Sequence, residues 1–269
     1  MVYKGEHILK FDAMLTFSNL KLAMSDDEQF YILTDKQKHY VVEENNDVLC
    51  VKQKKRSFFY WLFHWIPVKL EIKLPKFYKG NVKINNLNGA TFVDGVNLEK
   101  LEVENNNGRI EFNDIKSKNF KADSKNGKVI LSNIKVDSLE IKSNNGRMEF
   151  NNLNVATAIK AKSANGKIVV KDSEIESAEL YSSNGRIELQ STAVKDLKAL
   201  AINGRIIAFL NGQETEYSMD LTTSNGAAYI AGKKFRGGYV YRDKDRLKHI
   251  KANTKNGNIK FLFLNAEKV

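Results

Sequence analysis

Apolar and polar residues alternate with a period of two through most of the chain after about residue 80, a pattern typical of strands that bury one face. Asn-Gly dipeptides interrupt the alternation and mark tight turns, because both residues tolerate a positive φ. Nine of these dipeptides follow the repeat and begin at Asn88, Asn107, Asn126, Asn145, Asn165, Asn184, Asn203, Asn225 and Asn256, with successive spacings of 19, 19, 19, 20, 19, 19, 22 and 31 residues. A recurring distance of 19 residues indicates one coil that repeats along the chain.

The flanks of each dipeptide predict two strands per repeat. Inward apolar pairs such as Leu139 and Ile141 precede the turn, and pairs such as Met148 and Phe150 follow it. Such short strands become stable when they stack on their equivalents about 4.8 Å away. We therefore predict an all-β fold in which residues 80–269 form a right-handed parallel β-solenoid of about nine coils with a 19-residue repeat. The alternative is a sandwich of antiparallel hairpins.

A row of alternating charge favours the stacked arrangement. The residues five positions before each repeat Asn are Lys83, Glu102, Lys121, Glu140, Lys160, Glu179, Lys198, Asp220 and Lys251. If the coils stack in chain order, each charge lies between two of opposite sign, and each such pair contributes roughly 0.2–1 kcal/mol. The alternation also extends the predicted solenoid through the two irregular coils near the C-terminus.

A second row is positively charged throughout. The residue after the repeat Gly is basic in six coils, namely Arg109, Lys128, Arg147, Lys167, Arg186 and Arg205. Stacked in register, these side chains would form a linear anion-binding site with a strong dependence on salt. The alternative is a solvated face whose long side chains splay apart and pair with Glu111, Glu149 and Glu188, two residues further on in alternate coils.

Residues 1–79 lack the repeat and are predicted to form a β-rich cap, since an open coil exposes core and unpaired strand edges. Within them lies the aromatic segment 58–66, directly after a basic cluster. The candidate contact residues are Lys54, Lys55, Arg56, Phe58, Phe59, Trp61, Phe63 and Trp65. Cations beside aromatic rings are typical of a membrane-interface contact. The alternatives are a hydrophobic plug on the first coil and an interface with another subunit.

The coil that spans 31 residues is rich in Lys and Arg, from Lys233 to Lys248, and predicts a protruding basic hairpin with Gly237-Gly238 at its tip or bend. The last apolar run, Ile259 to Leu264, is expected to close the final coil.

Charge and composition narrow the partners. The 269 residues contain 43 Lys and Arg against 32 Asp and Glu, a net charge of +11, which favours an anionic membrane surface or an anionic polymer as partner. Specific nucleic acid recognition is not predicted. The single Cys50 precludes an intramolecular disulfide, and neither a signal peptide nor a stretch of 18 apolar residues is recognisable. The expected location is therefore cytoplasmic and peripheral at the membrane.

No catalytic residue, metal site or cofactor is predicted. The four histidines are scattered, and neither a Walker loop nor a Gly-x-Ser-x-Gly elbow occurs. Asp114 and Asp172 flank the basic row and are the sole candidates for a polysaccharide-active enzyme, although Asp is also a common turn former.

The units SNNGRMEF, SANGKIVV and SSNGRIEL, with the entry VKLEIKLPK, resemble the bacterial putative-adhesin family of repeat proteins over Val68 to Leu264. The resemblance implies a β-solenoid without enzymatic activity and a link to the cell envelope. It supplies no catalytic residues, and the chain lacks the export signal that an adhesin needs. Three hypotheses result: a non-enzymatic, adhesin-like binding protein that meets an anionic surface, a self-associating β-solenoid scaffold, and a polysaccharide-active enzyme.

Overall fold

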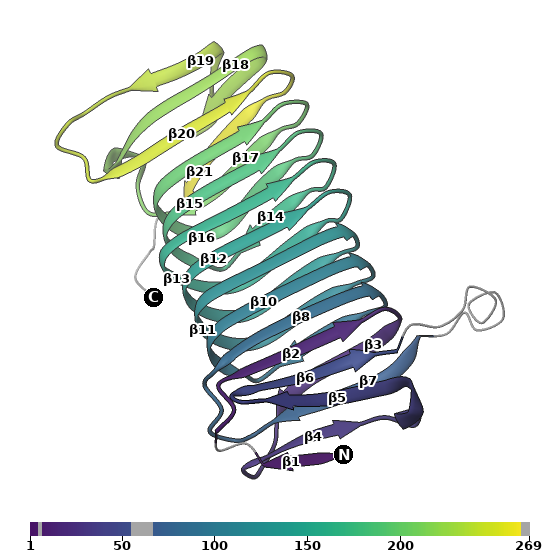
Figure 1. Ribbon diagram of the computed structural model, residues 1–269. Helices are drawn as coiled ribbons and strands as arrows, with labels where there is room; N and C mark the ends of the chain where they lie inside the picture. Colours follow the sequence, from purple (N-terminus) through teal and green to yellow (C-terminus); the bar gives the residue numbers. More distant parts are fainter. Residues whose placement is uncertain (5–6, 55–66, 265–269) are drawn as a thin grey trace. The chain divides into compact units, whose positions relative to one another are not determined.

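Stacked β-strands form almost all of the computed structural model, which describes residues 1–4, 7–54 and 67–264 (Figure 1). The chain divides into two compact units, residues 1–128 (unit 1) and 129–269 (unit 2). The all-β prediction is confirmed, and the parallel pairing of successive repeats confirms a solenoid-like arrangement rather than a sandwich of hairpins. The handedness, the number of coils and the division between residues 79 and 80 stay predictions.

Unit 1 contains eleven described strands and one 3₁₀ turn. They are β1 (Val2–Lys4), β2 (Lys10–Leu15), β3 (Ser18–Met24), β4 (Gln29–Leu33), η1 (Gln37–His39), β5 (Tyr40–Asn45), β6 (Val48–Gln53), β7 (Val68–Leu74), β8 (Asn81–Asn88), β9 (Thr91–Asp94), β10 (Asn97–Asn107) and β11 (Ile110–Asn126). Glu102 of β10 lies between Lys83 of β8 and Lys121 of β11, so these strands stack with an offset of 19 residues.

The layers of unit 1 do not follow chain order. Strand β2 lies between β6 and β8, and β3 lies between β7 and β9, all in parallel register. The segment 10–24 is thus inserted between two layers that come later in the chain. Antiparallel strands end the stack, with β5 on β6, β4 on β7 and β1 on β4. The described part of residues 1–79 is β-rich, and some of its strands stack like the repeat strands, while its role as a cap stays a prediction.

Unit 2 contains ten described strands and a second 3₁₀ turn. They are β12 (Val129–Ser143), β13 (Met148–Ser163), β14 (Ile168–Lys171), β15 (Glu174–Ser182), β16 (Ile187–Ala201), β17 (Ile206–Asn211), η2 (Glu214–Glu216), β18 (Tyr217–Ile230), β19 (Lys233–Tyr241), β20 (Lys248–Thr254) and β21 (Ile259–Leu264). The layers from β12 to β17 follow chain order.

The last two layers of unit 2 are reversed. Strand β20 pairs with β16 on one side and β18 on the other, and β21 lies likewise between β17 and β18. The prediction that Ile259 to Leu264 closes the final coil is therefore wrong, because the hairpin of β18 and β19 forms the last layer (Figure 1). After β17 the chain leaves one layer empty and forms β18 and β19. It then returns to fill the empty layer with β20 and β21.

This reversal also corrects the predicted charge row. Lys251 is the direct neighbour of Lys198 on one side and of Asp220 on the other. Two like charges are therefore adjacent, where the prediction expected strict alternation. Lys198 instead pairs with Glu179 of the preceding layer, with 3.2 Å between its Nζ and the carboxylate. In the earlier layers of unit 2 the charge alternates as predicted, from Glu140 through Lys160 to Glu179.

The Asn-Gly turns stack as continuous columns. In unit 2 neighbouring Asn carboxamides are joined by hydrogen bonds from Nδ2 to Oδ1 of 2.7–2.8 Å. The column contains, in spatial order, Asn145, Asn165, Asn184, Asn203, Asn256 and Asn225. Beneath it, the hydroxyls of Ser143, Ser163 and Ser182 accept hydrogen bonds from the glycine N–H three residues on, at 2.7–3.0 Å. The inward Ser therefore caps the turn that Asn-Gly makes.

Corners with a left-handed backbone explain the two aspartates considered for an enzyme. Asp114 and Asp172 have φ values of 51° and 49°, and Asn133 and Asn152 have the same left-handed conformation in neighbouring repeats of unit 2. Asn and Asp adopt this conformation more readily than other residues with a side chain. The backbone therefore accounts for both residue types.

Tyr217 should make unit 2 sensitive to alkali. Its ring is fully buried, and its hydroxyl donates to the carbonyl of Val194 at 2.9 Å. Burial, aided by the charge of Glu216, raises the pKa of Tyr217 from 10.0 to about 12. The folded state favours the neutral phenol of Tyr217. The stabilisation of the fold by this phenol is therefore complete below about pH 10 and is lost as the pH rises towards 12.

We expect the free energy of unfolding of unit 2 to fall by roughly 2–3 kcal/mol between about pH 10 and pH 12. Unfolding followed by circular dichroism, with tyrosinate absorbance in parallel, measures the loss. Lysines ionise in the same range, so Tyr217→Phe is the control and should show a shallower decline. Equal declines in both proteins would contradict the assignment to Tyr217.

Candidate anion-binding surfaces

The basic residues after the repeat glycines do stack in register within each unit. In unit 2 the carbonyls of Lys167, Arg186 and Arg205 accept the N–H of the residue that follows the basic position in the preceding layer, at 2.9–3.0 Å. Arg147, Lys167, Arg186 and Arg205 thus form one column, and Arg109 and Lys128 occupy equivalent positions in unit 1. The column does not continue beyond Arg205, because Asn258 is next.

Glutamates neutralise much of this row. Glu149 lies 2.7 Å from Nε of Arg147, and Glu188 lies 2.5 Å from Lys167 and 3.7 Å from Arg186. In unit 1, Arg109 pairs with Glu111. Burial works to raise the pKa of Glu188, but hydrogen bonds from Lys167 and Gln190 and the charges nearby outweigh it, so the pKa is lowered and the carboxylate stays ionised. These pairs follow the alternative interpretation of the row.

Arg205 differs from the other members of the column. It is exposed and forms no ion pair with any residue that the structure describes. Binding by the row as a whole stays a prediction, and Arg205 is the member best placed for it.

The basic hairpin near the C-terminus offers more uncompensated charge. Ala231 and Gly232 form its tip, whereas Gly237 and Gly238 form a bend inside β19 with φ values of +74° and +152°. Lys233, Lys234 and Arg236 of β19 are exposed, and none has an ion-pair partner within the described ranges.

Three cations at the base of this hairpin are paired instead. Arg242 lies 3.2 Å from Asp220, Arg246 lies 3.3 Å from Asp243, and Lys248 pairs with Glu216. Arg246 also stacks on the ring of Tyr241 at 4.2 Å from the centroid and donates to the carbonyl of Tyr217 at 2.7 Å. These three side chains are held by partners, whereas the exposed Lys244 beside them has no ion-pair partner among the described residues, like the three cations of β19.

Lys54 is the candidate contact residue of the aromatic segment and its basic cluster that lies within the described ranges. Lys54 is exposed, and its N–H donates to the carbonyl of His39 at 2.8 Å. The other candidates, Lys55, Arg56, Phe58, Phe59, Trp61, Phe63 and Trp65, lie outside the described residues. Their predicted contact with a membrane, plug or subunit stays a prediction.

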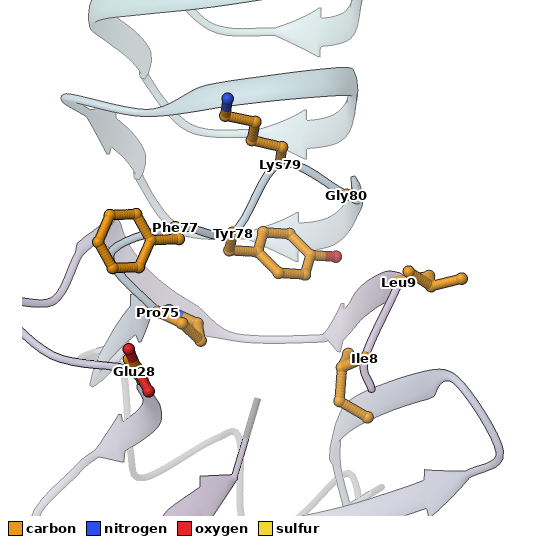
Figure 2. A pocket seen from close by; sticks show the side chains of 8 residues that line it. All are labelled: Ile8, Leu9, Glu28, Pro75, Phe77, Tyr78, Lys79 and Gly80. Carbon is orange, nitrogen blue, oxygen red and sulfur yellow. The ribbon is translucent and has the colours of Figure 1, made fainter. Parts of the chain in front are cut away.

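Two cavities lie in unit 1. The first, of about 540 Å³, is mainly apolar, with Phe77, Tyr78 and Leu9 around it and Glu28 and Lys79 at its margin (Figure 2). Burial raises the pKa of Tyr78, whose hydroxyl donates to the carbonyl of Asn81 at 2.9 Å. The second, of about 490 Å³, lies beside Lys21, Lys69 and Phe92. Neither cavity gathers a nucleophile, a base and an orienting group of the kind that catalysis requires.

The described residues contain no group of three or more His, Cys, Asp or Glu side chains that could hold a metal ion. In the same ranges, no helix has the length and apolar character needed to cross a membrane.

Comparisons with known proteins bear on the family. The chain is similar in structure to a putative adhesin from Bacteroides fragilis, with 17% identity, a TM-score of 0.49 and coverage of 97% of this chain and 95% of that one. It is also similar to a putative cell adhesion protein from Clostridium sporogenes, with 10% identity, a TM-score of 0.30 and coverage of 98% and 97%. No curated protein matches the sequence. A family model described as Toastrack DUF4097 matches residues 19–261, which confirms the family resemblance seen in the repeats, and the chain belongs to the Toastrack DUF4097 family.

Proposed function

We propose that this protein is a non-enzymatic, adhesin-like binding protein that contacts an anionic cell-envelope or membrane surface. The observation that carries the proposal is the set of exposed cations on β19, Lys233, Lys234 and Arg236, which have no counter-charge among the described side chains. Arg205 of the same unit adds a further unpaired cation. The proposal includes a cytoplasmic, membrane-peripheral location and a right-handed solenoid of about nine coils.

Attraction to an anionic surface should be substantial. Each Lys or Arg near such a surface contributes about 1 kcal/mol, and the attraction falls off within a Debye length, about 8 Å at physiological salt. Three cations on β19 therefore account for roughly a hundredfold in affinity.

Co-sedimentation with vesicles tests the proposal. The whole chain should bind phosphatidylserine-containing vesicles at low salt, lose binding at high salt and ignore phosphatidylcholine vesicles. The triple variant Lys233→Gln, Lys234→Gln, Arg236→Gln should bind roughly a hundredfold more weakly. The control is Arg147→Gln with Arg186→Gln, which removes two cations that are already paired with glutamates. A control that weakens binding as much as the triple variant would move the site from β19 to the basic row.

A second variant pair addresses the aromatic segment. Trp61→Ala with Trp65→Ala should weaken vesicle binding if the segment is an anchor, and should lower thermal stability alone if it is a plug. No binding by the unmodified chain to either vesicle at any salt concentration would reject the proposal.

The alternative function, a self-associating scaffold, is favoured by one observation. Strands β1 and β19 each pair with a single described strand, so each presents a free edge. Light scattering that rises with protein concentration would favour this function over surface binding.

A further inference from the structure

The free edge of β19 has an orientation that can be derived from its turn. Strands β18 and β19 are antiparallel, and Ile230 and Lys233 are the pair that closes the two-residue turn at Ala231 and Gly232. Both turn residues have a positive φ, 46° and 85°, which is the signature of a type I′ turn. In such a hairpin the closing pair exchanges hydrogen bonds, and the next residue points its N–H and C=O away. The backbone groups of Lys234 and Arg236 therefore face outwards.

No described strand meets this edge. Strand β19 pairs with β18 along Lys233 to Arg236 and again along Gly238 to Tyr241, and the structure records no partner strand for its other side. Its N–H and C=O groups form a row at strand spacing that another extended chain can complete.

The side chains restrict which chain can do so. Lys233, Lys234 and Arg236 are exposed along the same four residues that present the free backbone groups. Like charges on neighbouring strands are destabilising, and lysines on an edge strand prevent pairing with a second copy of the same strand. Opposite charges on neighbouring strands are stabilising. The edge of β19 therefore disfavours pairing with a second copy of β19 and favours pairing with an acidic strand.

The aromatic side chains give the edge a firm support. Phe235 is half-buried, and its ring lies 4.7 Å from that of Tyr239 across the bend at Gly237 and Gly238. Phe235 shares a face with its cross-strand partner Ala228, which is fully buried. The inward side chains thus hold β19 on the unit while the cations and outward amides stay accessible.

We propose that β19 binds an acidic, extended peptide segment of a partner protein by strand addition. This rests on the proposed function, because the same three cations would meet the anionic surface. A lipid surface would engage the cations alone, whereas an acidic strand also satisfies the outward N–H and C=O groups of Lys234 and Arg236. The peptide therefore uses both features that coincide on β19.

A pair of peptides of equal charge tests the proposal. The first is a capped peptide of alternating glutamate and valine, and the second is the same peptide with an N-methyl group on every main-chain amide, which removes the main-chain donors along both edges. Binding to the whole chain is measured by fluorescence anisotropy at low salt. We expect the first peptide to bind at least about tenfold more tightly than the second.

Two protein variants complete the test. The triple variant Lys233→Gln, Lys234→Gln, Arg236→Gln should lose at least about tenfold in affinity for the first peptide, and its thermal unfolding should match the unmodified chain because all three side chains are exposed. Arg147→Gln with Arg186→Gln should bind the peptide as the unmodified chain does.

The contrary outcomes separate the two proposals. Equal affinity for the two peptides, together with vesicle binding, would overturn strand addition and leave the anionic-surface function standing. Vesicle binding without any peptide binding would do the same. Binding of neither peptides nor vesicles would overturn both. Oligomers that disappear in the triple variant would show that β19 pairs with a second copy, and would also overturn the acidic-partner proposal.

Discussion

A chain that ends at Leu247 is expected to lose the folded structure of the last layers of unit 2, although it lacks little more than the final two strands. Strands β20 and β21 lie between β16–β17 and β18, so their removal leaves β18 and β19 without a neighbouring layer. It also removes Ile250, Ile259 and Phe261, each at most 2% exposed, from the core. At about 1.5–3 kcal/mol for each large side chain, the loss is at least about 5 kcal/mol, comparable with the stability of a whole domain.

Hydrogen exchange along β18 measures this effect. In the truncated chain the β18 amides should exchange at the rate of an unfolded segment, whereas those of β13 should stay protected. A chain that ends at Leu264 is the control and should keep full protection throughout. Protected β18 amides in the chain that ends at Leu247 would mean that β20 is not the layer on which β18 rests.

Gly185→Ala is expected to destabilise unit 2 by at least about 3 kcal/mol. A Cβ at this position would lie 2.1 Å from the carbonyl oxygen of Gly166 and 2.7 Å from the Ser182 hydroxyl that caps the turn. The obstacle is backbone in the adjacent layer, and each neighbouring glycine of the column meets the same limit, as Gly204 does against the Gly185 carbonyl. The turn therefore cannot yield without separating two layers.

Gly95→Asn is the matched control. Gly95 has a φ of +64°, but nothing lies within 4 Å of a Cβ placed there. Asp114 and Asn133 adopt the same conformation at other corners, so Asn at residue 95 should cost less than about 1 kcal/mol. Chemical denaturation of both variants gives the comparison. A Gly185→Ala protein as stable as Gly95→Asn would show that the glycine column is not closely stacked.

The repeat was predictable because its turns carry a strong local signal. Asn-Gly at a spacing of 19 residues, with inward Ser and alternating apolar residues, places strands such as β15 and β16 in the register that the structure shows. Corners with a positive φ recur at the same period in the sequence, at Gly95, Asp114, Asn133 and Asn152. These residue types tolerate a left-handed backbone, and that is the physical reason for their presence.

The order of the layers could not be read from the sequence. A parallel strand can pair with any strand of the same pattern, so the period states the offset and not which layer is adjacent. The charges were misleading here, since Lys251 next to Asp220 is favourable whether or not Lys251 also meets Lys198. Insertion of β2 and β3 was hidden as well, because no Asn-Gly dipeptide joins them.

The basic residues of the candidate site could be predicted from the sequence, but most of their ion-pair partners could not. The sequence places basic residues both in the row and in the hairpin, and it names the glutamates that neutralise Arg147 and Arg186. It cannot distinguish Arg242, which pairs with a residue 22 positions earlier, from Arg236, which has no partner in the described structure. That distinction depends on the fold of β18 against β19.

The reversed order of the last layers makes β19 the free edge of unit 2, and paired cysteines test it most directly. In a Cys50→Ser background, Lys198→Cys with Lys251→Cys places two outward thiols on directly paired residues, about 4.8 Å apart between Cα atoms, within the range for a disulfide. Lys198→Cys with Asp220→Cys places them two layers apart, about 9.6 Å, beyond that range. Mild oxidation and mass spectrometry of the monomer should find an intramolecular disulfide in the first protein and none in the second. A disulfide in the second protein and none in the first would show that the coils stack in chain order, with β20 and not β18–β19 as the last layer.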